Sequence, residues 1–217
     1  MMMNLFSVFD PATGNLALNW LSMLFLFMIP ISYWNLPSKT LSVMNLILNK
    51  LTMEIIMHLK KSEPTILLVS LFMFILINNI MGLLPYVFTS SAHLVFSLSM
   101  ALSMWVSIMI YGWTNKTNSM FIHLVPVGTP PPIMPFMVMI ESISNMIRPG
   151  SLAVRLSANM IAGHLLMSLL GNNLINNFTI LMIMMWLIMG LMMFELAVAF
   201  IQSYVFMTLS TLYYSEI

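Results

Sequence analysis

The sequence predicts an all-α polytopic membrane protein that forms a single membrane domain over residues 1–217. Of its 217 residues, 60% are hydrophobic and only 6% are charged, whereas soluble domains carry roughly 25% charged residues. The mean hydropathy of +0.98 points the same way. Long stretches carry no charge, and about 20 apolar residues are enough to cross the bilayer core. We therefore expect several transmembrane helices and no soluble domain.

The first two predicted elements differ in their charge pattern. Residues 16–34 are apolar with aromatic residues at the ends, so we expect an N-terminal transmembrane helix, kinked near Pro30. Residues 38–61 place apolar and charged side chains on opposite helix faces, which is typical of an amphipathic helix lying in the membrane interface. The apolar stripe comprises Met44, Ile47, Leu48, Leu51, Ile55 and Leu59, and the charged face comprises Lys50, Glu54, His58 and Lys61.

Residues 64–113 predict an antiparallel transmembrane hairpin. Pro64 and Pro85 bound its first span, because proline is tolerated in a first helical turn and interrupts a helix elsewhere. The second span runs from His93 to Trp113. The basic residues then fall on one side of the membrane, which the positive-inside rule assigns to the cytoplasm or matrix. These residues are Lys39, Lys50, Lys60, Lys61 and Lys116.

After a Pro-rich connector, the sequence predicts a pair of long helices over residues 133–170 and 174–215. The Pro149-Gly150 pair leaves open whether the first helix is interrupted, and Gly171 to Asn173 indicate a turn. Residues 178–214 contain neither Pro nor a polar turn, and 37 residues at 1.5 Å each give about 55 Å. Because the bilayer core is about 30 Å thick, we expect two long, strongly tilted helices.

Ionisable side chains inside the apolar segments are functional candidates, because burying an arginine at mid-membrane costs about 2.5–3.5 kcal/mol or more. On a continuous helix, Asn159 and Glu141 each lie about 40° from Arg155, and His164 lies on the opposite face. Glu195 and Gln202 share one face of the last helix. The candidates are Glu141, Arg148, Arg155, His164 and Glu195, with Glu216 at the end of the chain.

These residue types favour proton transfer over covalent catalysis. Carboxylates and histidines exchange protons within a few pH units of neutrality, whereas arginine keeps its proton and acts as a fixed charge. We find no phosphate-binding loop, nucleophile elbow or metal-ligand spacing, and the chain has no cysteine. We therefore expect no metal and no cofactor. The net charge of +1 gives no basic footprint for nucleic acid.

Several alternatives remain open from the residues alone. Arg155 could neutralise Glu195 as a buried structural pair, and Arg148 is interpreted as a residue that snorkels to the interface. A secondary transporter or stand-alone ion channel could use the same charges, although transporters often contain internal repeats and none is visible here. A purely structural membrane subunit is the remaining rival, for which these buried charges would be costly.

Two motifs resemble subunit a of the F-type ATP synthases. They are LAVRLSANMIAGHLL at residues 152–166 and FELAVAFIQSYVF at residues 194–206, with a weaker agreement in NIMGLLP at residues 79–85. Together with the Pro-rich stretch leading to Glu141, the resemblance covers most of the chain from Thr65 onward. The 27 methionines resemble the bias of mitochondrially encoded invertebrate members.

The resemblance implies a proton-translocating stator subunit that couples proton flow to rotation and ATP synthesis, without an ATP-hydrolysing site of its own. The implied partners are a ring of c subunits, other stator and membrane subunits, the lipid bilayer and protons. The implied location is the mitochondrial inner membrane. The distribution of basic residues then predicts the N-terminus in the intermembrane space, and we expect the C-terminus in the matrix.

The resemblance also implies a role for each candidate residue. Arg155 would face the c-ring carboxylates between two half-channels. His164 and Glu195 would line the channel from the intermembrane space, and Glu141 would lie toward the matrix channel. The remaining positions are Glu216, which matches a terminal acidic position loosely, and Asn159 and Gln202, which match polar positions that support the arginine.

Overall fold

The computed structural model describes residues 5–14, 16–28, 36–59, 63–125, 128, 130–173 and 178–216, and over these residues the ordered elements are all helical. The predicted all-α membrane fold is confirmed, since five helices within this part of the chain are long and apolar enough to cross a membrane. The long helices are α1 (Lys39–Leu59), α2 (Thr65–Gly82), α3 (Leu94–Asn115), α5 (Met134–Asn173) and α6 (Phe178–Ser215). The short elements are η1 (Leu5–Phe9), η2 (Leu18–Met28), η3 (Ser90–Ala92), α4 (Thr117–His123) and η4 (Pro131–Ile133).

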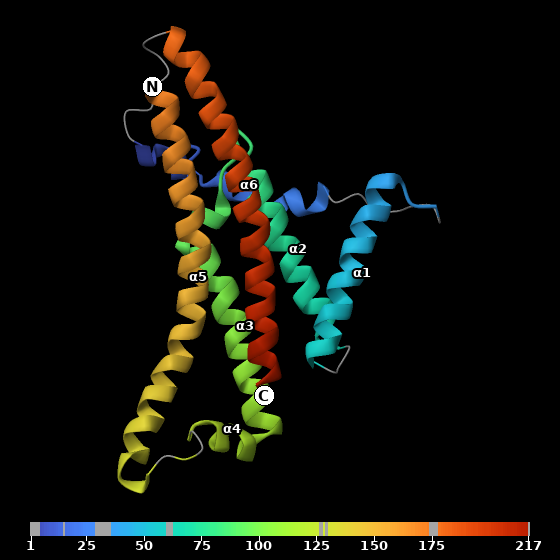
Figure 1. Ribbon diagram of the computed structural model, residues 1–217, viewed down its shortest axis with the longest axis vertical. Helices are drawn as coiled ribbons and strands as arrows, with labels where there is room; N and C mark the ends of the chain where they lie inside the picture. The colour runs from blue at the N-terminus through green and yellow to red at the C-terminus, as the bar shows by residue number, and fades with distance from the viewer. Residues whose placement is uncertain are drawn as a thin grey trace.

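The helices α5 and α6 run antiparallel, side by side, along the longest axis of the molecule (Figure 1). They contain 40 and 38 residues, so they are about 60 Å and 57 Å long at 1.5 Å per residue. α5 continues through Pro149 without a break. A proline inside a helix costs about 3 kcal/mol, and burial of the turn that follows, at Leu152 and Ala153, offsets that cost.

The helices α2 and α3 occupy the residues predicted for the hairpin, and each packs mainly against a different long helix. α2 lies along α6, and α3 lies along α5. Both arms contribute to one apolar cluster with the long helices, so the hairpin holds α5 and α6 together. The cluster comprises Ile75, Ala101, Leu152, Ala153, Leu156 and Phe206.

The helix α1 packs its predicted apolar stripe against the rest of the molecule. Leu51, Ile55 and Leu59 are buried and contact α2 and α6, whereas the N-terminal part of the stripe is more exposed. The helix lies beside α2 and is oblique to the two long helices (Figure 1). It is also long and apolar enough to cross a membrane, so its position in the interface plane stays a prediction.

The N-terminal segment differs from the α-helix expected over residues 16–34. Residues 18–28 form the 3-10 helix η2, and residues 29–35 lie outside the described residues. Local hydrogen bonds set the beginning of η2, because Thr13 Oγ1 accepts from the Leu18 N–H at 3.2 Å and the Asn19 side chain donates to the Asp10 carbonyl. The segment crosses behind the long helices rather than running along them (Figure 1).

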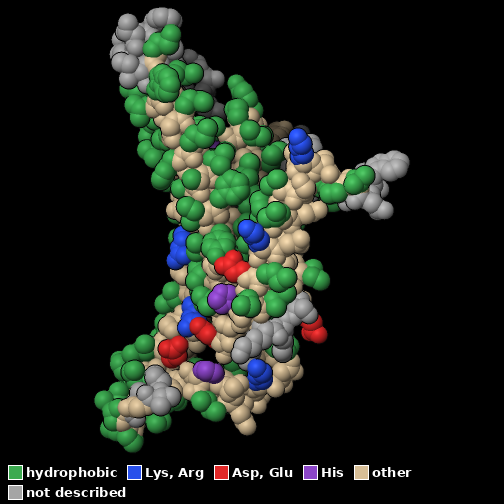
Figure 2. Space-filling model, turned by 45° about the vertical axis from the view of Figure 1, so that its right-hand side comes forward, with side chains coloured by type: hydrophobic (Ala, Val, Ile, Leu, Met, Phe, Trp, Pro, Cys, Tyr) green, Lys and Arg blue, Asp and Glu red, His purple; other side chains and the backbone are tan. Residues whose placement is uncertain are grey.

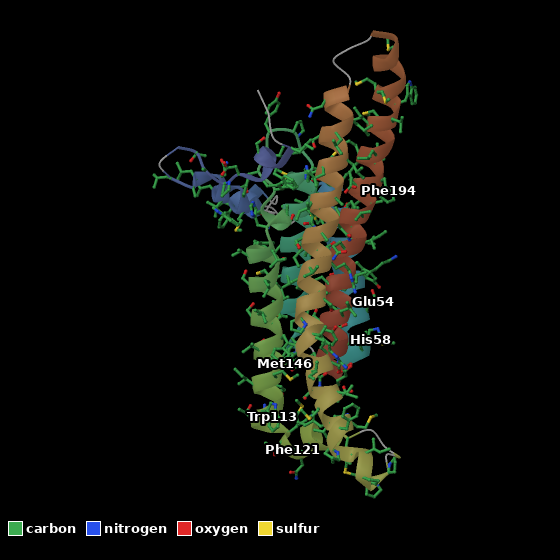
Figure 3. The ribbon with its side chains drawn as sticks, turned by 90° about the vertical axis from the view of Figure 1, so that its left-hand side faces the viewer. Glu54, His58, Trp113, Phe121, Met146 and Phe194 are labelled. Carbon is green, nitrogen blue, oxygen red and sulfur yellow. The ribbon has the colours of Figure 1, made fainter. Side chains whose placement is uncertain are left out.

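The charged side chains are unevenly distributed over the molecule. On the face in Figure 2 most lie in the lower half, whereas the upper part of the long helices is almost entirely apolar. At the lower end, Trp113 of α3 meets Phe121 of α4 edge to face at 5.0 Å between ring centroids (Figure 3). This contact folds α4 back toward α3 and leads the chain into α5.

Candidate functional site

Arg155 lies near the middle of α5 with an exposed side chain. Its neighbours Ala153 and Leu156 are buried in the core cluster, so α5 directs one face into the protein and presents Arg155 on another. Among the described residues no carboxylate forms an ion pair with Arg155. The interpretation of Arg155 as a structural partner of Glu195 is therefore wrong, and its charge is available to a group outside this chain.

Asn159 and Gln202 join the two long helices one turn from Arg155. The Asn159 side-chain amide donates to Gln202 Oε1 at 3.0 Å, and Gln202 is 4% exposed. Asn159 lies near Arg155, as predicted, because it follows four residues later on the same helix. The bond fixes the separation of α5 and α6 at the level of Arg155.

Glu195 is buried in α6, 5% exposed, and reaches across to α5. Its carboxylate occupies the space that a β-carbon on Gly163 would fill. The neighbouring residue, His164, has a buried Nε2 atom without a hydrogen-bond partner among the described residues, and its ring lies edge-on to Phe9 at 6.2 Å between centroids. The structure thus brings the Glu195 carboxylate to the α5 turn that carries His164.

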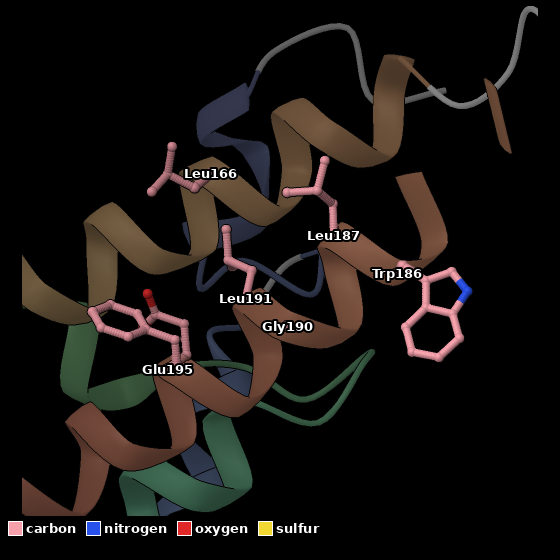
Figure 4. Close-up of a pocket in the computed structure, with 7 residues that line it drawn as sticks. Leu166, Trp186, Leu187, Gly190, Leu191 and Glu195 are labelled. Carbon is pink, nitrogen blue, oxygen red and sulfur yellow. The ribbon is translucent and has the colours of Figure 1, made fainter. Parts of the chain in front are cut away.

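An open apolar depression of about 700 Å³ leads to Glu195 along α6. In Figure 4 the Glu195 side chain points toward α5, whereas Trp186 points away from it at the far end. The depression lies toward the end of the molecule where α5 ends and α6 begins. Its other lining residues are Leu166, Leu187, Gly190, Leu191 and Phe194.

A second group of charges lies on the other side of Arg155 along α5. Arg148 Nη1 donates a hydrogen bond to Glu216 Oε2, and Arg148 Nη2 lies 3.9 Å from Glu141 Oε1. The guanidinium also lies over the ring of Tyr213 at 5.2 Å. Arg148 is therefore an ion-paired residue, and its predicted position at the membrane interface stays a prediction. Glu216, which was aligned only loosely, is part of this group.

Two features of the site were missed from the sequence. Gly163 looked like an ordinary helical glycine within the 152–166 motif, although its lack of a β-carbon makes room for a residue 32 positions later. Glu54, on the charged face of α1, accepts a hydrogen bond from the Tyr204 hydroxyl of α6. Neither contact has a local sequence signal, because each joins two different helices.

Comparison with known proteins decides the family. The family model described as ATP synthase A chain matches residues 15–215. The ATP synthase subunit a of Anopheles gambiae is 55% identical to this chain over the whole length of both, that of Drosophila mauritiana is also 55% identical, and that of Locusta migratoria is 51% identical, again at full coverage.

The chain belongs to the ATP synthase subunit a family.

This membership confirms the predicted function as the proton-conducting subunit of the membrane sector of an ATP synthase, and it decides against a secondary transporter or a stand-alone channel. Partnership with other ATP synthase subunits follows from this membership. The five long apolar helices agree with a multi-pass membrane protein. The family model covers α5 and α6 in full, so the exposed Arg155 and most of the two groups of ionisable residues lie within the matched part of the chain.

Proposed function

We propose that this chain conducts protons through two half-channels that meet at Arg155, where the carboxylates of a rotating c-ring pass. The single observation that carries the proposal is the exposed, unpaired state of Arg155 among the described residues, between two separate groups of ionisable side chains. Every other arginine or carboxylate that the structure places in α5 and α6 is buried, hydrogen-bonded or ion-paired.

The order of residues along α5 supports two paths rather than one. His164 lies nine residues after Arg155, about 13.5 Å along the helix, and Arg148 lies seven residues before it, about 10.5 Å in the other direction. The Glu195 carboxylate joins the first group through its contact at Gly163. Glu141 and Glu216 join the second through Arg148. The fixed charge of Arg155 therefore separates the two groups.

The mechanism follows from these positions. A proton taken up through Glu195 and His164 neutralises a ring carboxylate, which can then face lipid without the cost of a buried charge. After the ring turns, the carboxylate releases its proton toward Glu141 and Glu216. Arg155 attracts the ionised carboxylate and cannot itself release a proton, so it prevents a direct leak. Each proton contributes about 2.3 kcal/mol per 100 mV of membrane potential.

The orientation that we propose places the C-terminus in the matrix and the N-terminus in the intermembrane space of mitochondria. The end of α6 lies beside the end of α3, since Tyr214 stacks on Tyr111 at 5.9 Å between ring centroids. Lys116 follows directly after α3. The positive-inside rule assigns that end to the matrix, so the Arg148 group forms the matrix-side path.

Replacing Arg155 by alanine tests the proposal. In the assembled ATP synthase, Arg155→Ala should abolish proton-driven ATP synthesis while the complex still assembles, because the exposed side chain supports no internal contact. Val154→Ala is the matched control, since Val154 is the adjacent exposed residue, and it should retain normal synthesis. Normal proton-driven synthesis by the Arg155→Ala complex would overturn the proposal.

A further inference from the structure

Arg148 forms ion pairs with two carboxylates that come from different parts of the chain. Glu141 lies two turns earlier on α5, and Glu216 lies just beyond the last residue of α6. Tyr213, one turn before Glu216, places its ring under the guanidinium. The planar fork of arginine donates a hydrogen bond to Glu216 with Nη1 while Nη2 lies 3.9 Å from Glu141, an ion pair without a hydrogen bond. The end of α6 is thereby held on the α5 face that carries Glu141.

A cavity of about 50 Å³ opens on this group between α3, α4, α5 and α6. Because one water needs about 10–15 Å³, the cavity has room for several waters. Asn145, Arg148, Tyr213 and Glu216 line it. Pro149 has no N–H, so the Asn145 carbonyl lacks its usual helical donor and offers another acceptor at the same turn. The α3 and α4 residues that line it are not titratable: Trp105, Ile108, Met109 and Met120.

The group is aligned with Arg155. Glu141, Arg148 and Arg155 follow one another at intervals of seven residues, so they lie within about 20° per step along one face of α5. Two carboxylates and one guanidinium leave the group one formal negative charge, which attracts a proton that arrives from the direction of Arg155.

We propose that Arg148 is a positioning residue of the matrix-side path, which holds Glu141 and Glu216 together at a water-sized cavity so that protons pass between them. The inference deepens the proposed function and rests on it. Without Arg148, Glu216 is held only by the end of α6 and leaves the cavity, and the path loses one of its two carboxylates.

The test compares variants in the intact ATP synthase reconstituted into liposomes, with the pH on each side of the membrane varied separately. Arg148→Gln should lower proton-driven ATP synthesis by about tenfold or more, since misplacing a group by about 1 Å can cost up to about a hundredfold in rate. It should also change the dependence of the rate on pH at the C-terminal side only. Ser142→Ala is the control, because Ser142 is exposed and its hydroxyl donates only to the Met139 carbonyl of its own helix; it should match the unmodified complex.

A second pair of variants separates positioning from folding. If Arg148 acts by holding Glu216, then Glu216→Gln should also change how the rate of ATP synthesis depends on pH at the C-terminal side. The double variant, with both Arg148→Gln and Glu216→Gln, should then be only slightly slower than Arg148→Gln alone. Independent, multiplying losses in the double variant would overturn the inference. If Arg148→Gln prevents assembly, Glu216→Gln alone decides, and an unchanged pH dependence on the C-terminal side would overturn the inference.

The outcome for Arg155 separates this inference from the proposed function. Loss of synthesis in Arg155→Ala together with an unchanged profile in Arg148→Gln would reject only the role of Arg148. Normal synthesis in Arg155→Ala would reject the two-path proposal itself, whatever Arg148→Gln shows.

Discussion

The carboxylate of Glu195 on α6 fills the space beside Gly163 on α5 that any other amino acid would use for its β-carbon. Gly163 is itself buried, and the next residue is His164. The close approach of the two helices at this point is therefore what allows a buried acidic side chain to reach the turn of α5 that carries the histidine.

Substitution of Gly163 by alanine should displace Glu195. The added methyl group would overlap the carboxylate, and overpacking of this kind costs about 1–3 kcal/mol. We expect proton-driven ATP synthesis to fall by about tenfold or more, because the displaced carboxylate no longer meets the His164 turn. Gly171→Ala is the matched control, since nothing lies within 4 Å of a β-carbon there. Equal rates for the two variants would show that the close approach has no functional role.

Replacing His164 or Glu195 by leucine should slow proton uptake from one side of the membrane. Both side chains lie in the group on the far side of Arg155 from Arg148, and leucine cannot exchange a proton. The measurement is passive proton flux through the membrane sector, with the gradient imposed in each direction and the pH varied on each side. The flux should lose its dependence on pH at the N-terminal side. Unchanged flux in both variants would rule out this path.

The bond between Asn159 and Gln202 should contribute to the stability of the helix pair. Gln202→Leu removes the acceptor and leaves the half-buried Asn159 amide unpaired, at a cost of about 1–3 kcal/mol. The double variant Asn159→Leu with Gln202→Leu should recover most of that loss, because two apolar partners replace a matched polar pair. The thermal stability of the assembled complex, measured for the single and the double variant, tests both expectations. A double variant less stable than Gln202→Leu would contradict the expected coupling.

The bond from Tyr204 to Glu54 should hold α1 against α6. Tyr204→Phe removes only the hydroxyl, and a hydrogen bond to a charged group contributes about 1.5–3 kcal/mol. We expect faster amide hydrogen exchange in α1, with ATP synthesis unchanged, since neither residue belongs to the two proton paths. His58→Ala, one turn after Glu54 on α1 (Figure 3), is the control. Slower synthesis by Tyr204→Phe at normal exchange would mean that the pair acts in transport.

The extent to which the sequence predicts this molecule depends on the range of the interaction concerned. The unbroken α6 follows from a long apolar run without Pro or a polar turn, and the buried stripe of α1 at Leu51, Ile55 and Leu59 follows from helical periodicity. The position of Asn159 near Arg155 has the same local origin. In these cases neighbours three, four or seven residues apart determine the result.

Contacts between distant helices escaped prediction for a physical reason. Arg148 meets Glu216 across 68 residues, and no periodicity within α5 indicates which face α6 will cover. The continuity of α5 through Pro149 also depends on packing between helices. Burial of Leu152 and Ala153 after the proline outweighs the local cost of a proline inside a helix. The 3-10 form of η2 depends on side-chain bonds from Thr13 and Asn19 that compete with a regular helix.

The division of the hairpin, with α2 along α6 and α3 along α5, has a mechanical consequence. A partner that turns against the exposed face of α5 exerts a sideways load on a slender rod about 60 Å long. The apolar cluster of Ile75, Ala101 and Phe206 with the α5 core braces that rod near its midpoint from behind, at the level of Arg155. In the proposed mechanism, this support limits bending of α5 at Arg155 and so keeps the distance between the fixed charge and a passing carboxylate nearly constant under torque.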